Sequence, residues 1–355
     1  MSTKRHLSIF LVQAFVVAVI TFLVAELTLR LYNRISPSFV FYSTSYNRFR
    51  GKPFAPDYDF HLNSKGFKDV EFNTQKAEGI FRILALGDSF AYGVVPYQYN
   101  YLTLLKKNVK QGSGRFELIN MGIPSIGPRD YLSIFVNEGL DLKPDMVIIS
   151  FFIGNDFDNP LKEKLYRHSY VASLAEYLFS LYWHFKGHIY SAQIGYDDHA
   201  PTFTDQKYLE IEKNRSRIFR KGNKYFESDF AIAVSYILRI KELCEKRKIH
   251  LTVVIIPDEM QVNGPLQQDV IRALGRRSDD FDFTLPNRLL EEKFKEQNID
   301  YVDLLAGFLS EAAHERLYKP NDSHWNIAGN KLASELIQRY LSGQLRLFEK
   351  ETAFR

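Results

Sequence analysis

The sequence predicts an α/β protein, a three-layer α/β/α sandwich with helices on both faces of a parallel sheet, preceded by an N-terminal transmembrane helix. Short, continuous apolar runs alternate along the chain with longer segments of helical periodicity. Strands that are apolar along their whole length are typical of parallel sheets buried on both faces. An uncharged apolar stretch near the N-terminus predicts the membrane helix.

The apolar runs and the periodic segments follow one another in the order that a parallel sheet requires. A helix between consecutive strands returns the chain to the same end of the sheet, so that the strands run parallel. The predicted strands are 82–86, 116–121, 146–153, 251–256 and 301–304. The predicted helices are 99–109, 128–140, 231–246, 287–297 and 327–341.

Residues 7–25 form the uncharged stretch that predicts a membrane helix. As a helix it would measure roughly 28 Å at about 1.5 Å per residue, close to the thickness of the hydrocarbon layer. Lys4 and Arg5 precede it and favour a cytoplasmic N-terminus. Residues 23–25 make a poor cleavage site, so an uncleaved signal anchor is expected, with a cleaved signal peptide as the competing interpretation. Either one places the bulk of the chain outside the cytoplasm, which in a bacterium means the periplasm or the cell surface.

One main domain with accessory segments is predicted. Residues 160–228 interrupt the alternation of strands and helices and are interpreted as an insertion that is helical near 169–184. The predicted segments are 1–30 (cytoplasmic stub and anchor), 31–79 (juxtamembrane connector), 80–345 (main domain, including the insertion) and 346–355 (C-terminal tail). The aromatic side chains of the insertion are expected to pack in a small satellite core, with lining of a substrate groove or contact with the membrane as alternatives. These side chains are Tyr177, Phe179, Tyr182, Trp183 and Phe185.

Composition narrows the classes of partner and cofactor. The chain has 355 residues, of which 45% are hydrophobic and 25% charged, as in globular domains. Its formal net charge of +4 is small and not gathered into runs, so no nucleic-acid partner is expected. The single cysteine, Cys244, excludes an internal disulfide and a cysteine-based metal site. His184 and His188 are interpreted as a surface pair, so no metal is expected.

Polar residues that suit nucleophilic catalysis follow the predicted strands. Ser89 follows the first strand, Gly122 the second and Asn155 the third, and Asp322 and His324 precede the last helix. Binding sites of open parallel sheets form at the carboxyl ends of the strands, where the strand order reverses. These segments are therefore expected to converge at one edge of the sheet.

Each of these residue types has a place in ester chemistry. A serine hydroxyl is a weak nucleophile, and His324 could take its proton at neutral pH. Asp322 would hold the imidazole in one tautomer and stabilise its charge. The backbone N–H groups of Ser89 and Gly122, with the side-chain amide of Asn155, would form an oxyanion hole.

The same residues carry a resemblance to a known family. Gly-Asp-Ser at 87–89, Gly122, Gly-Asn-Asp at 154–156 and Asp-x-His-Trp at 322–325 resemble the four sequence blocks of the SGNH/GDSL hydrolase superfamily, over about residues 80–342. The resemblance implies a flavodoxin-like sheet and ester hydrolysis or acyl transfer without a metal or cofactor. It implies Ser89 as nucleophile, His324 as base, Asp322 as its orienting acid, and Ser89, Gly122 and Asn155 at the oxyanion hole.

The spacing of the acid departs from the commonest pattern of that family. Many members place the aspartate three residues before the histidine, where this chain has Asn321, and the acid here is Asp322. The Asp-x-His-Trp spacing is similar to that of alginate O-acetyltransferase relatives and other exported members. It favours acyl transfer to a polysaccharide more than the common spacing does.

The sequence therefore supports three candidate functions. The first is a membrane-anchored serine esterase that acts on acetyl or other acyl esters of a glycan or lipid. The second is an O-acyltransferase that modifies an extracytoplasmic polysaccharide, and the third is a catalytically silent glycan-binding module. An α/β-hydrolase is disfavoured because Gly87–Ala91 does not complete the G-x-S-x-G motif.

Overall fold

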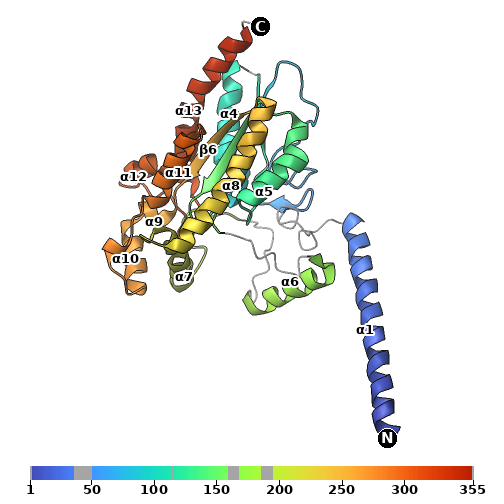
Figure 1. The fold of residues 1–355 in the computed structure, drawn as a ribbon. Coiled ribbons are helices and arrows are strands. Elements are labelled where there is room, and N and C mark those ends of the chain that lie inside the picture. The colour runs from blue at the N-terminus through green and yellow to red at the C-terminus, as the bar shows by residue number, and fades with distance from the viewer. Residues whose placement is uncertain (1, 36–49, 114, 159–167, 185–194, 354–355) are drawn as a thin grey trace. The chain divides into compact units, whose positions relative to one another are not determined.

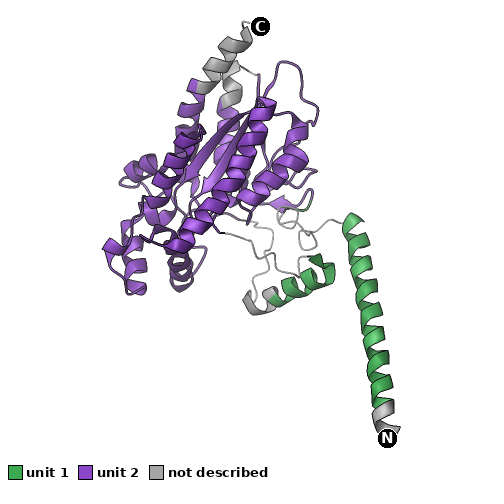
Figure 2. Ribbon diagram, viewed as in Figure 1, with its two compact units in different colours: residues 1–52, 160–191 green, residues 53–159, 192–355 purple. Residues whose placement is uncertain are grey.

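The computed structural model describes the chain except for residues 1, 36–49, 114, 159–167, 185–194 and 354–355. It contains two compact units, which are described separately here (Figure 2). One unit consists of residues 1–52 and 160–191, and the other of residues 53–159 and 192–355. The larger unit holds the β-sheet and all of the candidate site residues.

The larger unit is built on a five-stranded parallel sheet, as predicted (Figure 1). Its strands are β3 (Phe81–Gly87), β4 (Phe116–Asn120), β5 (Met146–Phe152), β6 (His250–Ile256) and β7 (Asp300–Asp303). All seven residues of β5 are buried, which is why its sequence is apolar apart from Ser150 rather than alternating. The edge strand β7 is only partly buried, and its sequence is correspondingly more polar.

The strand order is β4-β3-β5-β6-β7, which in chain order of these five strands is the flavodoxin-like 2-1-3-4-5. Strand β3 lies between β4 and β5, with Ala85 opposite Asn120 on one side and Gly87 opposite Ser150 on the other. The chain therefore leaves β3 toward one side and later returns to the other side. In open parallel sheets, ligands usually bind at such a reversal, which lies here at the carboxyl ends of β3 and β5, where Ser89 and Asn155 follow.

Helices cover the two faces of the sheet. Helices α4 (Tyr101–Ser113) and α13 (Ile327–Ala353) pack against each other, as do α5 (Pro128–Ile134) and α8 (Lys224–Arg247). Figure 1 shows α5 and α8 in front of the sheet. Residues of β3, β4, β5 and β6 share one hydrophobic core with residues of α4 and α13. The three-layer prediction is confirmed.

The predicted helices are present with shifted ends. The segment predicted as 128–140 is α5 followed by a π-helical turn, Phe135–Gly139, and a 3₁₀ turn, Leu140–Leu142. Helix α11 (Leu285–Glu296) agrees with its prediction. Helix α13 was predicted to end at 341, but it runs to Ala353 and so includes most of the predicted tail.

Several short elements were not predicted. They have too few residues for a periodic pattern, or lie in segments interpreted as connector and insertion. They are the hairpin β1 (Pro56–Asp57) and β2 (Phe60–His61), and the helices α3 (Ser89–Tyr92), α7 (Asp205–Arg215), α9 (Glu259–Val262), α10 (Gly264–Ala273) and α12 (Leu305–Glu311). The described part of this unit also contains 3₁₀ turns at Tyr97–Tyr99, Ser216–Phe219 and Ser278–Asp280.

The compact units divide the chain differently from the predicted segments. Residues 53–79 belong to the unit of the sheet rather than to a separate connector, and so do residues 192–228 of the predicted insertion. Both stretches contribute hydrogen bonds to the interior of that unit, such as those from Lys68 to the carbonyls of Gly93 and Val95. The domain boundaries given above stay a prediction.

The smaller unit contains α1 (Ser2–Ile35) and α6 (Tyr170–His184). In the part of the chain that the structure describes, α1 is the one helix long and apolar enough to cross a membrane, a test that a signal sequence also passes. The carboxylate of Glu26 in α1 accepts hydrogen bonds from the backbone N–H groups of Tyr170 and Val171, at 3.0 and 2.9 Å. Glu26 thereby satisfies the free N–H groups at the start of α6.

Helix α6 matches the helix predicted near 169–184. Phe179 on this helix is 59% exposed, which contradicts the expectation that it packs in a satellite core. The side chains of Tyr182 and Trp183, and all of Phe185, lie outside the described residues.

Candidate active site

Ser89 is the first residue of helix α3, directly after the central strand β3. The preceding residue, Asp88, is fully buried and caps this short helix, because its Oδ1 accepts a hydrogen bond from the N–H of Phe90 at 2.9 Å. The cap turns the chain sharply at the end of the strand. Ser89 is thereby held at the carboxyl edge of the sheet, as the sequence predicted.

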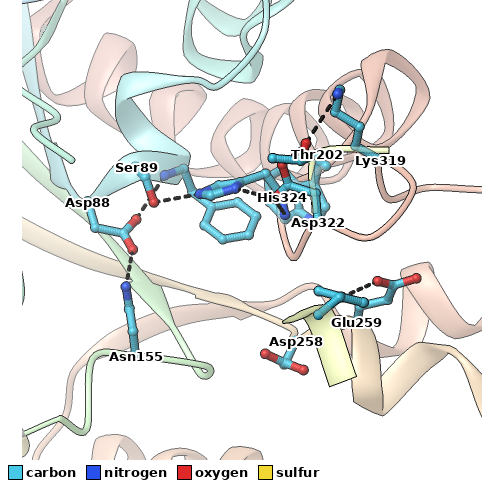
Figure 3. A network of polar contacts seen from close by, with 12 residues as sticks. Asp88, Ser89, Asn155, Thr202, Asp258, Glu259, Lys319, Asp322 and His324 are labelled. Carbon is cyan, nitrogen blue, oxygen red and sulfur yellow. Dashed lines mark hydrogen bonds and ion pairs between the residues drawn. The ribbon is translucent and has the colours of Figure 1, made fainter. Parts of the chain in front are cut away.

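His324 contacts both of the side chains that the sequence assigned to it (Figure 3). Its Nε2 lies 2.8 Å from the hydroxyl oxygen of Ser89, which is 235 residues away along the chain. Its Nδ1 lies 2.6 Å from Oδ1 of Asp322. An ionised carboxylate only accepts hydrogen bonds, so Nδ1 carries the proton, and Nε2 of the neutral ring is free to accept from Ser89.

Asp322 is ionised in this environment. Burial on its own would raise the pKa of this carboxyl group, but the positive charge of His324 when protonated and hydrogen bonds from His324 and Thr202 lower the pKa to about 2. The side chain is only 3% exposed, so these partners replace the water that it has lost.

Asn321, which stands at the position of the acid in many members of the resembling family, does not face His324. Its backbone has a φ of 47°, in the left-handed region that asparagine tolerates. Its side-chain amide donates to the carbonyl of Phe203 at 3.1 Å and to Asp205 at 2.5 Å. Of the two neighbours, Asp322 is the one that contacts the imidazole.

Aromatic packing explains why segments so distant in sequence meet. Phe90 follows Ser89 and Trp325 follows His324, and the two rings pack edge to face with centroids 4.8 Å apart. Trp325 is 2% exposed and also contacts Tyr101 and Phe308 in the core. Because each reactive residue is attached to one of these buried rings, the core sets the distance between serine and histidine.

Asn155 follows β5 and reaches the same edge of the sheet. Its side-chain Nδ2 donates to Oδ2 of Asp88 over 2.9 Å, a contact drawn in Figure 3. An amide nitrogen carries two hydrogens, so this bond leaves one of them for another acceptor. Asp88 thus links the residues that follow β3 to those that follow β5.

Gly122 lies against the same turn, with its N–H engaged. A Cβ on this residue would collide with the backbone of Ala91 and Tyr92, so only glycine fits here. Its N–H donates to the side-chain oxygen of Asn120 at 2.9 Å. The expected role of Gly122 as a third oxyanion donor would therefore require that hydrogen to be shared with Asn120.

The structure also adds residues that the sequence reasoning missed. The hydroxyl of Thr202 lies 2.6 Å from Oδ2 of Asp322, and the ammonium of Lys319 lies 3.2 Å from that hydroxyl (Figure 3). Thr202 lies in an irregular stretch of the predicted insertion, where no periodicity or motif marks it. Among the residues described, no group of three histidine, cysteine or acidic side chains is placed to hold a metal ion.

The fold and this site together define a class of protein, an α/β sandwich with a Ser–His–Asp arrangement at the carboxyl edge of its parallel sheet. Solved structures similar to this chain include a two-domain esterase active on acetylated mannans, with 15% identity and a TM-score of 0.41. The match covers 74% of this chain and 49% of that one, so the chain spans about half the length of that esterase.

Two further similar structures are covered over most of their own length. An acetyl xylan esterase has 16% identity and a TM-score of 0.39, with 73% of this chain and 99% of that chain covered. A GDSL-like lipase from Bacteroides thetaiotaomicron has 13% identity and a TM-score of 0.39, with 76% and 92% covered. No protein-family model matches the sequence, and no curated protein matches it.

Proposed function

We propose that this chain is a serine esterase of the SGNH/GDSL type that cleaves acyl esters, with Ser89, His324 and Asp322 as its catalytic triad. The observation that carries the proposal is the continuous chain of contacts from Ser89 Oγ to His324 Nε2 at 2.8 Å and from His324 Nδ1 to Asp322 at 2.6 Å. The order Ser, Gly, Asn, His of the sequence blocks supports the same assignment.

The mechanism follows from this geometry. The oxygen of Ser89 attacks the ester carbonyl while Nε2 of His324 takes the hydroxyl proton, which gives a tetrahedral intermediate. His324 then returns that proton to the departing alcohol, and an acyl group remains on Ser89. Water attacks the acyl-enzyme by the same route, releases the carboxylic acid and restores the serine. Asp322 stabilises the imidazolium in both halves of the reaction.

The negative charge of the intermediate needs fixed donors. Among the described contacts, the N–H of Ser89 has no hydrogen-bond partner, and Asn155 has one amide hydrogen left after its bond to Asp88. These two groups are the proposed principal donors of the oxyanion hole, with Gly122 sharing its hydrogen as a third. Asp88 holds the Asn155 amide in place by accepting the hydrogen bond from its Nδ2.

The proposed setting is the surface of a membrane outside the cytoplasm. Helix α1 would act as an uncleaved anchor, and the substrate would be an acyl ester carried by a glycan or a lipid. The acetylated mannans named for one similar structure are an example of such an ester.

Activity of the full chain in detergent tests the proposal. Wild type should hydrolyse p-nitrophenyl acetate, and Ser89→Ala should lower kcat by about 10⁴-fold or more, because triad members act as a unit. The exposed Ser278→Ala is the matched control and should retain wild-type kcat. A fluorophosphonate should label Ser89 in the wild type, as read by peptide mass spectrometry. A glycan-binding module without catalysis would show neither hydrolysis nor labelling.

A further inference from the structure

Residues 196–203, here called the strap, lie along the loop that carries His324. The N–H of Thr202 donates to the carbonyl of Pro320 at 3.0 Å, and the N–H of Phe203 donates to that of Asn321 at 3.3 Å. The amide of Asn321 returns a hydrogen bond to the carbonyl of Phe203 at 3.1 Å. The strap is therefore bound to the chain immediately before Asp322.

The strap is also bound to the chain after His324. Both carboxylate oxygens of Asp198 accept from the N–H of Ile327, the first residue of α13, at 3.1 and 3.3 Å. The hydroxyl of Tyr196 donates to Asp198 at 2.5 Å. Because the strap holds the loop on both sides of the histidine, it can influence where the triad side chains stand.

Thr202 is where the strap reaches the triad itself. Its hydroxyl lies 2.6 Å from Oδ2 of Asp322, although the two residues are 120 positions apart. The ammonium of Lys319 lies 3.2 Å from the same hydroxyl and 2.8 Å from the carbonyl of Ala200. An ammonium group can only donate, so the Thr202 oxygen accepts from Lys319 and its own hydrogen must point to Asp322.

The two oxygens of Asp322 have different partners. Oδ1 receives the backbone N–H of His324 at 3.0 Å and its ring Nδ1–H at 2.6 Å. Oδ2 receives the hydroxyl of Thr202. If that hydroxyl were lost, Oδ2 would remain covered without this donor, and only the hydrogen bonds to Oδ1 would hold the carboxylate against the imidazole.

We propose that Thr202 is a positioning residue of the triad, which fixes the Asp322 carboxylate against His324 through a hydrogen bond whose direction Lys319 sets. The inference rests on the proposed function, because it assigns Thr202 to the same Ser89–His324–Asp322 site. It places a determinant of catalytic rate in the stretch before α7, outside the four sequence blocks.

Two substitutions at this position separate hydrogen bonding from packing. Thr202→Val keeps the shape of the side chain and removes the donor, and Thr202→Ser keeps the donor and removes the methyl group. Loss of a hydrogen bond to a charged group costs about 1.5–3 kcal/mol, which corresponds to roughly 10- to 100-fold in rate. Thr202→Val should lower kcat by that factor with KM within about twofold, and Thr202→Ser should recover most of the loss.

The control is a threonine of the same kind elsewhere in the unit. Thr284 is exposed before α11, and its hydroxyl donates to Asp282 at 2.7 Å. Thr284→Val should leave kcat and KM at wild-type values. If Thr202→Val kept wild-type kcat, or if Thr202→Ser lost as much kcat as Thr202→Val, the proposal would be overturned.

A double-mutant cycle tests the part played by Lys319. Lys319→Met should lower kcat less than Thr202→Val, because the hydroxyl remains but its direction is no longer imposed. Once the hydroxyl is gone, Lys319→Met should add little, so the double variant should resemble Thr202→Val alone. Additive losses would show that Lys319 acts independently of Thr202 and would overturn its role in the proposal.

Failure of this inference can be told from failure of the proposed function. If Ser89→Ala retained wild-type hydrolysis, the triad assignment itself would be wrong. If Ser89→Ala abolished hydrolysis while Thr202→Val matched the wild type, the esterase would stand and the positioning role would fall. Each variant is measured on the full chain with the same soluble ester.

Discussion

Two buried aspartates near His324 have pKa shifts in opposite directions. The pKa of Asp88 is raised, because the cost of burying its charge outweighs its hydrogen bonds to Phe90 and Asn155. The pKa of Asp322 is lowered to about 2, because His324 and Thr202 supply more stabilisation than burial removes. Asp322, the carboxylate that the proposed mechanism pairs with an imidazolium, is thus the one whose charged form is favoured.

The lowered pKa of Asp322 predicts a pH-dependent contribution to stability. A carboxyl group whose folded pKa lies below its unfolded value stabilises the fold above the unfolded pKa, near 3.8, and loses that effect as pH falls toward 2. The contribution at neutral pH is about 2 kcal/mol. In chemical unfolding from pH 6 to pH 2, the gap in unfolding free energy between wild type and Asp322→Asn should shrink below about pH 4. A gap that stayed constant with pH would contradict the shift.

The amide of Asn155 should act on the transition state rather than on substrate binding. Asn155→Ala is expected to lower kcat by about 10²–10³ with little change in KM, as for other single oxyanion donors. Steady-state kinetics on a soluble ester measure both constants. The exposed Asn73→Ala serves as the matched control and should leave both unchanged. A change in KM alone would assign Asn155 to substrate binding instead.

At the scale of elements, the site depends on how α3 packs against the segment just before α13, which carries His324 and Trp325. Phe90 on α3 contacts the ring of Trp325, whose chain neighbour is His324, and the Phe90 and His324 rings are themselves 5.2 Å apart. The edge-to-face arrangement is directional, so it fixes orientation as well as distance. The two elements therefore place Ser89 and His324 with little freedom.

Phe90→Leu tests this coupling against a matched substitution. Phe294 on α11 is also fully buried, so Phe294→Leu should cost a similar free energy of unfolding, about 1 kcal/mol. Phe90→Leu alone should also lower kcat, by about tenfold, because small displacements of reacting groups are costly. Thermal unfolding and steady-state kinetics of both variants make the comparison. Equal kcat in the two variants would show that the ring pair does not position the triad.

At the scale of the whole molecule, the chain joins an apolar N-terminal helix to an α/β sandwich that carries the proposed triad. Helix α1 has large exposed hydrophobic side chains along its length, including Phe10 at 65% and Phe15 at 69% exposure. Water is a poor solvent for such a helix, whereas the lipid interior would accept it. An anchored esterase would act on esters close to the membrane surface.

An uncleaved anchor predicts that the protein is found in the membrane fraction and keeps its N-terminal residues. The full chain should remain in the membrane fraction after carbonate washing, and mass spectrometry should find peptides from residues before 25. Val16→Lys together with Ile20→Lys should release it, because each central charge costs about 2.5–3.5 kcal/mol of insertion free energy. Tyr225→Lys, at a position 83% exposed on α8, is the control. A mature chain beginning just after residue 25 would identify a cleaved signal peptide instead.

The predictable parts of the structure are those with a local signal. Strand β5 could be placed from sequence because burial on both faces favours a nearly continuous apolar run, interrupted here by Ser150. Helix α7 and the hairpin β1–β2 could not, because their sequences are polar or too short for a period to register. The π-helical turn that follows α5 was not predicted either, since it departs from the 3.6-residue repeat on which the prediction of a helix at 128–140 was based.

The sequence by itself determined the layer architecture, because hydrophobic periodicity is a local property. It also placed Ser89 after β3, Asn155 after β5 and His324 before α13, because the ends of strands and helices have local signals. Only the tertiary structure decided that Asp88 holds Asn155, that the N–H of Gly122 is engaged by Asn120, and that Thr202 completes the partners of Asp322. Two of these contacts, Asp88–Asn155 and Thr202–Asp322, join residues 67 and 120 positions apart along the chain. They follow from how the sheet and its loops pack.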